Sequence, residues 1–336
     1  MNIRDRQGLR SRAAQALADA AVSPAKLALL HSGAAVALSL VLTVLNVILT
    51  EMISDTGGLS GMGMRSVLST AKAMLGILSM VVMPFWELGF VYAALKIARG
   101  QSGGFGDMLR GFRRFGPVLR LKLLELALYM AIIILGANIG SSIFLMTPYA
   151  APLMEAMMAA EVTTPEALME AMGGNMLPMY AIAAVVVCVL LVPVWYRFRM
   201  AQYLIVDDPA IGALAALGTS HRLMRHNRFA LFRLDLSLWW YYGLQMICAI
   251  AAYSDLLADS FGLQLPFSAT AALFIAFAIY ALVRLAVAWY CDSPVAVTYA
   301  AAYDALQEMQ KDAEPRVTKN FPWDFLPERA PEDAEE

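Results

Sequence analysis

Long apolar stretches alternate along the chain with shorter polar connections. Six stretches reach the roughly 20 residues that a helix needs to cross the hydrocarbon core of a bilayer. They cover residues 24–53, 67–98, 119–145, 176–206, 229–257 and 268–290. Ser23 and Pro24 suit the N-cap and the first position of the first helix. The pattern predicts an all-α, polytopic membrane protein with six transmembrane helices and additional amphipathic interfacial helices.

Composition agrees with this prediction. Hydrophobic residues make up 60% of the 336 residues and charged residues 15%, and the mean hydropathy is +0.61. Soluble domains are about 45–50% apolar and about 25% charged. A formal net charge of -2 gives no support to nucleic-acid binding. The composition therefore favours the bilayer as the main partner of the chain.

Lys and Arg are concentrated in alternate connections. They gather in residues 1–26, 96–122 and 197–233, whereas the 51–66 connection has only Arg65 and the 147–175 and 258–267 connections have none. Basic residues mark the cytoplasmic side of membrane proteins. We therefore expect a multi-pass protein of a bacterial plasma membrane, with the N-terminus and the C-terminus in the cytoplasm.

The same pattern divides the chain into three parts. Residues 1–23 are expected to form a cytoplasmic amphipathic helix, residues 24–307 the six-helix transmembrane domain, and residues 308–336 a cytoplasmic tail. The tail is acidic and rich in proline, a composition that is typical of disordered segments.

Two basic connections could contact lipid or a partner. Residues 105–122 interleave aromatic and basic side chains, as interfacial helices do, and a second helix is expected from Pro209 to His226 after an N-cap carboxylate. The candidate contacts are Arg110, Arg113, Arg114, Arg222, Arg225 and Arg228. The alternative is that these charges only set topology and anchor the helices at the surface.

Four ionisable residues fall within the predicted spans, where a charge is costly and suggests function. They are Glu87, Glu125, Asp235 and Arg284. Glu87 and Arg284 should lie at similar depths, which makes them a candidate ion pair. A transporter would use such a cluster as a substrate or proton site, whereas the structural alternative is an ion pair with snorkelling side chains.

Gly136 and Gly140 in the third span form a GxxxG arrangement, which predicts close helix packing, within the chain rather than between copies. The sequences HExxH and GxSxG and the Walker A loop are absent, and no pattern indicates a metal site or a cofactor. These observations favour a protein that is not an enzyme.

The segment DDPAIGALAALGTSHRLMRHNRFALFRLDLS resembles the hallmark region of the uncharacterised bacterial integral-membrane family catalogued as domain of unknown function 975. The matching positions include Asp207, Pro209, Ser220, Met224, Asn227, Phe232 and Ser237. Upstream, RGQSGGFGDMLRGF is also similar to the family pattern, whereas His226 stands where a Gly is usual. The resemblance implies an α-helical membrane protein, with no activity attached.

Two functions are favoured by these features, and a membrane-embedded enzyme is a third and weaker possibility. The first is a non-enzymatic membrane module that acts through its basic cytoplasmic helices on anionic lipid headgroups or on a membrane-protein partner. The second is a transporter of small solutes or peptides that uses the polar cluster around Glu87 and Arg284. The sequence does not indicate an oligomeric state.

Overall fold

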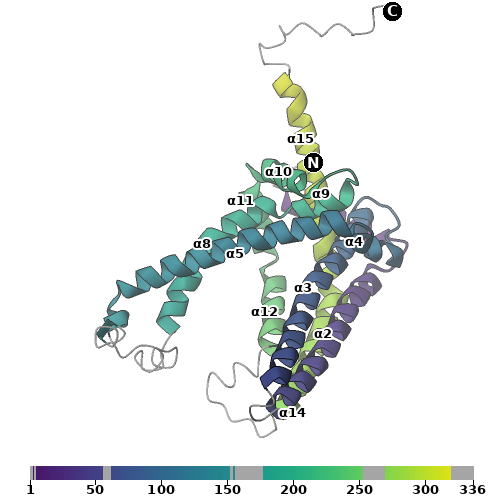
Figure 1. Cartoon of the computed structure of the whole chain (residues 1–336). Helices are drawn as coiled ribbons and strands as arrows, with labels where there is room; N and C mark the ends of the chain where they lie inside the picture. Colours follow the sequence, from purple (N-terminus) through teal and green to yellow (C-terminus); the bar gives the residue numbers. More distant parts are fainter. Residues whose placement is uncertain are drawn as a thin grey trace, which may run out of the picture.

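The computed structural model describes residue 3 and residues 5–55, 62–151, 154–155, 177–252 and 269–318, and these residues form helices and no strand. Figure 1 shows their arrangement. The long helices are α2 (Pro24–Asp55), α3 (Met62–Ala98), α5 (Phe115–Leu145), α8 (Leu177–Phe198), α12 (Trp239–Ala252), α14 (Ala269–Val287) and α15 (Ser293–Thr318). The shorter elements are α1 (Arg6–Ala18), η2 (Phe105–Leu109), α4 (Arg110–Arg113), η3 (Pro148–Ala150), α9 (Ala201–Asp207), α10 (Ala213–Met224), α11 (Arg228–Ser237) and the π-helical turn η4 (Ala288–Asp292).

Four helical segments of the described residues are long and apolar enough to cross a membrane. They are Pro24–Ile53, Gly63–Ala98, Pro178–Asp207 and Thr270–Lys311. The chain is therefore compatible with a membrane protein, and four of the six predicted spans are supported. Of the other two, 119–145 is helical as part of α5, and 229–257 is described only to residue 252.

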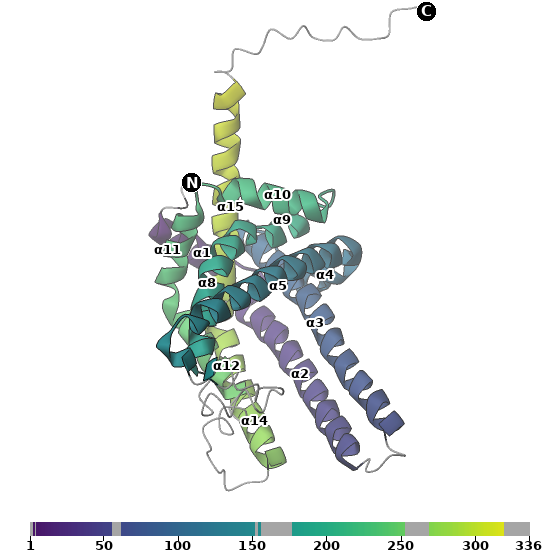
Figure 2. The same cartoon turned by 60° about the vertical axis from the view of Figure 1, so that its left-hand side comes forward.

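Short helices gather around one end of the long ones, in a region that we call the junction. It comprises α1, α9, α10 and α11 together with the start of α15 and the adjoining ends of α2, α3 and α8 (Figure 2). Its core contains fully buried apolar side chains from several of these elements, among them Leu9, Met200, Met224 and Tyr303. The predicted N-terminal helix is thus present as α1 and packs against α3 and α15.

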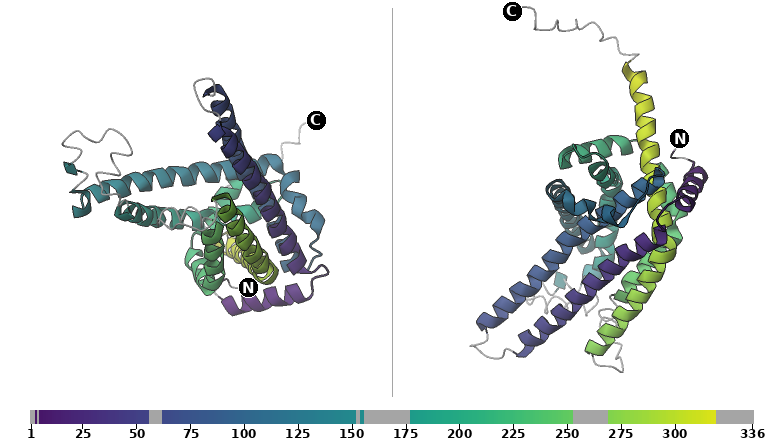
Figure 3. Two further views of the ribbon diagram at one scale, coloured as in Figure 1. Left: turned by 90° about the horizontal axis from the view of Figure 1, so that it is seen from below. Right: turned by 90° about the vertical axis from the view of Figure 1, so that its right-hand side faces the viewer.

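Helices α5 and α8 form a hairpin that diverges from the group of α2, α3, α12 and α14 (Figures 1 and 3). Two glycines allow the close approach within this hairpin. A Cβ atom on Gly136 would lie 2.8 Å from the side chain of Val187, and one on Gly140 would lie 2.4 Å from Cα of Ala183. The predicted GxxxG packing within the chain is therefore confirmed.

Glycine also lets η2 and α4 pack against α3. A Cβ on Gly89 would lie 1.8 Å from the carbonyl oxygen of Met108, and one on Gly111 would lie 2.0 Å from that of Phe85. The ring of Phe85 stacks on Phe115 with the centroids 4.7 Å apart. The basic 105–113 segment is therefore held tightly against the end of α3.

Several helices differ in extent from the prediction. The interfacial helix expected over 105–122 is divided into η2, α4 and the first turns of α5, and the helix expected over 209–226 is the shorter α10. The predicted fifth span is broken at Leu238 between α11 and α12. The hydroxyl of Ser237 donates a hydrogen bond of 2.6 Å to the carbonyl of Leu234, a bond that competes with the helical backbone pattern.

The C-terminal segment is helical for longer than expected. Helix α15 ends at Thr318, ten residues beyond the start of the predicted tail at 308. Residues 319–336, to which the expectation of disorder also applied, lie outside the described residues.

Candidate functional site

Asp235 is the centre of a buried polar network in the junction. Its carboxylate accepts hydrogen bonds from Tyr196 and Arg199, and one of 2.5 Å from Tyr299. The side chains of Asp235 and Arg199 are only 9% and 10% exposed, and the Arg199 guanidinium lies 4.4 Å from the centroids of both Trp195 and Tyr299. This predicted site residue is fully satisfied within the protein, so it acts as a structural anchor between α8, α11 and α15.

Arg99, directly after the end of α3, links this helix to α9 and α15 in a second network. It donates hydrogen bonds of 2.5 and 2.9 Å to Asp207 at the end of α9, and one of 2.7 Å to Asp304 in α15. Tyr303 donates a further hydrogen bond of 3.1 Å to Asp207. The hydrogen bonds to Asp207, more than any other contact, raise the pKa of Arg99 above its ordinary value.

A third network surrounds Arg284. Its guanidinium pairs at 2.7 Å with Asp292, two helical turns further along the same helical run, and not with Glu87 as the sequence suggested. Asp292 lies in the π-helical turn η4 and also accepts hydrogen bonds of 3.1 Å from Ser32 and Tyr241. A carboxylate close to Arg284 on the same helical run thus satisfies the charge that Glu87 was expected to neutralise.

The other ionisable residues of the predicted spans are separated. Glu125 pairs with Lys122 at 3.0 Å, within a single turn of α5. Glu87 lies on the wall of a cavity of about 390 Å³ between α2, α3, α9, α12, α14, η4 and α15. Arg284 and Asp292 line the same cavity. The predicted cluster is therefore brought together only in part, through Glu87 and Arg284.

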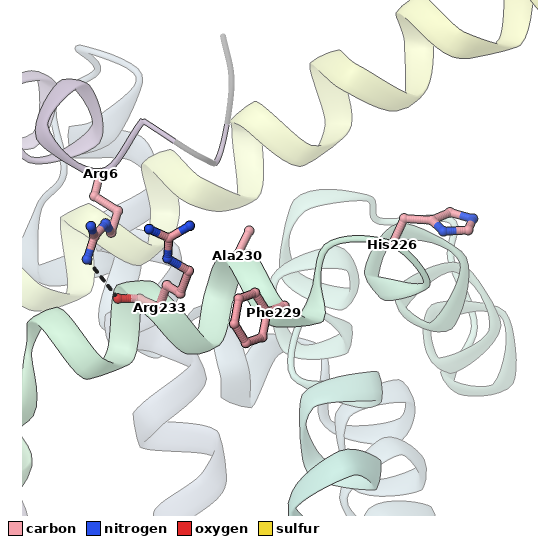
Figure 4. Close-up of a pocket in the computed structure, with 5 residues that line it drawn as sticks. All are labelled: Arg6, His226, Phe229, Ala230 and Arg233. Atoms are coloured by element: carbon pink, nitrogen blue, oxygen red, sulfur yellow. Dashed lines mark hydrogen bonds between the residues drawn. The ribbon is translucent and has the colours of Figure 1, made fainter.

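A basic cavity of about 240 Å³ lies at the N-terminal end of α11 (Figure 4). It is lined by Arg6, His226, Phe229, Ala230 and Arg233. Figure 4 shows Arg6 of α1 next to Arg233, with a hydrogen bond of 3.5 Å from its guanidinium to the backbone oxygen of Arg233, whereas His226 lies farther away. No ion pair joins either arginine to another residue in the described part of the chain. We call this cavity the basic site.

The first turn of α11 adds to the positive character of the basic site. Asn227 stands at the N-cap but provides no side-chain cap. Its side-chain nitrogen donates to the carbonyl of Leu223 at 3.0 Å. Uncapped N–H groups and the helix dipole attract anions to a helix N-terminus. The basic site therefore combines these groups with two guanidinium groups that no carboxylate in the described part of the chain neutralises.

Exposed apolar side chains run along α11 and on to the start of α12, beside the basic site. Phe229, Phe232, Leu236 and Trp239 are 70%, 43%, 60% and 70% exposed. The spacing of three or four residues places Phe229, Phe232 and Leu236 on one face of α11. Trp239 follows as the first residue of α12. Such a stripe, next to positive charge, is typical of helices that lie in the headgroup layer.

The basic residues predicted to contact lipid or a partner have unequal surroundings. Arg114 is used within the protein, because it donates to the carbonyls of Ile205, Asp208 and Pro209. The other five have fewer contacts: Arg110 lies 4.8 Å from the ring of Tyr92, Arg222 bonds to Thr219, Arg228 has a buried Nε without a partner, and Arg113 and Arg225 are exposed. Only some of these charges are thus accessible to a ligand.

A family model described as "Protein of unknown function (DUF975)" matches residues 26–301, which is most of the chain. The chain belongs to this family. No curated protein and no solved structure matches it.

The residues that resemble the DUF975 hallmark build the junction. Asp207 binds Arg99, the carbonyl of Pro209 accepts from Arg114, and Ser220 donates to the carbonyl of Arg197 at 3.1 Å. The other four positions have structural surroundings too: Met224 is buried, Asn227 bonds to Leu223, Phe232 packs against Tyr196, and the hydroxyl of Ser237 accepts from Arg10. In this DUF975 protein, the motif therefore contributes mainly to the packing of the short helices.

Sequence reasoning missed Arg6 and Arg233 as a pair, because they are 227 positions apart and meet only in the folded chain. It also missed Asp292, although this acidic residue at the end of the last apolar stretch was a usable signal. Among the described residues, no group of three or more His, Cys, Asp or Glu side chains is arranged to hold a metal ion.

Proposed function

We propose that this DUF975 protein is a non-enzymatic membrane module that binds anionic lipid headgroups at the basic site. The observation that carries the proposal is the pair Arg6 and Arg233, which no described carboxylate neutralises, beside an exposed apolar stripe. A phosphate group would be attracted by both guanidinium groups and by the uncapped first turn of α11. Phe229 and Trp239 would enter the adjoining acyl region.

We further propose that the junction faces the cytoplasm of a bacterial plasma membrane and that the chain crosses it six times. The basic residues of segments 1–26, 96–122 and 197–233 support this orientation. In addition to the four supported spans, α5 and α12 would supply the third and fifth crossings. The three native cysteines are first replaced by Ser, and single cysteines are then introduced at Arg12 and Arg65. Labelling with a membrane-impermeant maleimide tests the orientation, because only the Arg65 position should react from outside.

Headgroup binding can be tested with the full chain purified in dodecyl maltoside. Native mass spectrometry would compare the retention of phosphatidylglycerol with that of phosphatidylcholine. We expect the double variant Arg6→Gln, Arg233→Gln to bind phosphatidylglycerol about tenfold more weakly, because two direct charge contacts are lost. Binding by the unmodified chain should also weaken as salt screens these contacts.

Arg113→Gln is the matched control, since Arg113 of α4 is an exposed arginine outside the basic site. It should retain the affinity for phosphatidylglycerol. Equal losses of affinity in the double variant and in Arg113→Gln would show that the general surface charge, and not the basic site, attracts the lipid. If the double variant retained full affinity, headgroup binding at this site would be wrong, and an acidic segment of a membrane-protein partner would become the better ligand.

A transporter of small solutes or peptides is the second candidate function. It is favoured by the 390 Å³ cavity, which Glu87 and Arg284 both line. Uptake into proteoliposomes tests this function: neutral replacement of Glu87 should stop flux in a transporter while the protein stays folded.

A further inference from the structure

The 390 Å³ cavity has the size and mixed lining of a small-molecule site. Ligand sites usually have volumes of about 300–1,000 Å³ and combine apolar walls with a few polar groups. Here Ala35, Phe90 and Val91 provide apolar wall, while Glu87, Arg284 and Asp292 provide charge. The ring of Phe90 is held in place by the stacked ring of His31, whose centroid is 4.6 Å away.

The positive charge in the cavity wall is already neutralised. Arg284 pairs with Asp292 at 2.7 Å. The same carboxylate accepts hydrogen bonds of 3.1 Å from Ser32 and Tyr241, so its oxygens are well occupied. These groups form a closed network that neither requires a charged ligand nor offers a free guanidinium to an anion.

Glu87 has a different environment. Neither an ion pair nor a hydrogen bond joins its carboxylate to another residue in the described ranges. With Arg284 and Asp292 cancelling each other, the formal charge of the cavity wall is that of Glu87 alone. A carboxylate within a membrane-spanning segment is costly unless a counter-charge or water stabilises it. The cavity therefore favours a positive ligand.

We propose that this cavity binds a small organic cation, an amine whose ammonium group pairs with Glu87. The apolar part of the amine contacts Phe90, Val91 and Ala35. Attraction between the cation and the face of an aromatic ring adds to the ion pair. An anion is disfavoured by Glu87, and a neutral molecule of the same shape lacks the ion pair.

The amine site is separate from the basic site, and binding there does not require that the ligand crosses the membrane. Failure of headgroup binding would leave the amine proposal intact, and the reverse also holds. The ammonium group could belong to a free solute or to the headgroup of phosphatidylethanolamine, since both present the same chemistry to Glu87.

Isothermal titration calorimetry on the full chain in dodecyl maltoside would test the proposal with three probes of similar shape. We expect benzylamine to bind, and benzyl alcohol and benzoate to bind at least tenfold more weakly. If benzoate or benzyl alcohol bound as tightly as benzylamine, the proposal would be overturned. Addition of phosphatidylethanolamine identifies the source: competition with benzylamine indicates the lipid headgroup, and its absence indicates a free amine.

Two variants localise the binding. Glu87→Gln should weaken benzylamine binding at least tenfold, whereas Glu125→Gln, which removes an acidic residue outside the cavity, should leave it unchanged. Ala35→Phe should abolish binding by filling the cavity while Glu87 remains. Each variant is first checked for an unchanged elution volume in size-exclusion chromatography. A folded Glu87→Gln or Ala35→Phe variant with unchanged affinity would show that benzylamine binds elsewhere.

Discussion

Two sets of arginines in the junction differ in what surrounds them. Arg99 and Arg199 are paired with carboxylates from distant parts of the chain. Arg6 and Arg233 contact each other through a backbone oxygen and have no carboxylate partner among the described residues. The first set fixes helices, whereas the second leaves positive charge exposed to a ligand. The partner of an arginine, more than its position in a basic segment, therefore indicates its role.

The largest effect is expected from breaking the most buried pair. Asp235→Asn would leave Arg199 without its counter-charge and disturb the hydrogen bonds from Tyr196 and Tyr299. We expect the free energy of unfolding to fall by about 3 kcal/mol, because an unpaired buried charge remains. Unfolding by sodium dodecyl sulfate, followed by circular dichroism, measures this change.

The double variant Arg199→Gln, Asp235→Asn is the control for this interpretation. Its loss of unfolding free energy should be smaller than the sum of the losses in the two single variants, because the double variant leaves no isolated charge. An additive result would show that the two residues stabilise the junction independently.

A smaller effect on stability is expected from replacing Arg114, and almost none from replacing its neighbour Arg113. Arg114→Gln removes hydrogen bonds to the carbonyls of Ile205, Asp208 and Pro209, and should lower the free energy of unfolding by about 1.5 kcal/mol. Arg113→Gln should change it little, because Arg113 is exposed. The same denaturation assay compares the two variants, and equal losses of stability would contradict the rule that the contacts of an arginine indicate its role.

The smallest effect concerns pH. Burial, followed by the positive charges of Arg197, Arg228 and Arg225, lowers the pKa of His221 in α10 below its ordinary value. Below about pH 6.5 the unfolded chain therefore binds a proton at this position more readily than the folded chain, so stability falls as the pH falls. Melting temperatures at pH 7.5 and 5.5 should show this decrease, and His221→Gln should make it smaller. An identical decrease in His221→Gln would assign the pH effect to other groups.

The sequence predicted the helices better than their contacts. Apolar length located α2, α3 and α8 closely, and the spacing of Gly136 and Gly140 predicted the packing of α5 against α8, because these signals are local. Arg113 and Arg114 are indistinguishable in sequence, since their roles depend on which carbonyls α9 and its following loop bring near. The predicted pairing of Arg284 with Glu87 was wrong for a related reason. It rested on the expected depth of the two residues in the membrane, whereas the actual partner, Asp292, is placed by the π-helical turn.

The continuous helical run from α14 through η4 to α15 has a mechanical consequence. It carries Asp292, Tyr299 and Asp304, which belong to the three separate polar networks. Asp292 and Asp304 are twelve residues apart, which is about 18 Å along a helix. Because one rod holds a member of each network, we expect an axial shift of the rod at the cavity to move Asp304, and with it the contact to Arg99.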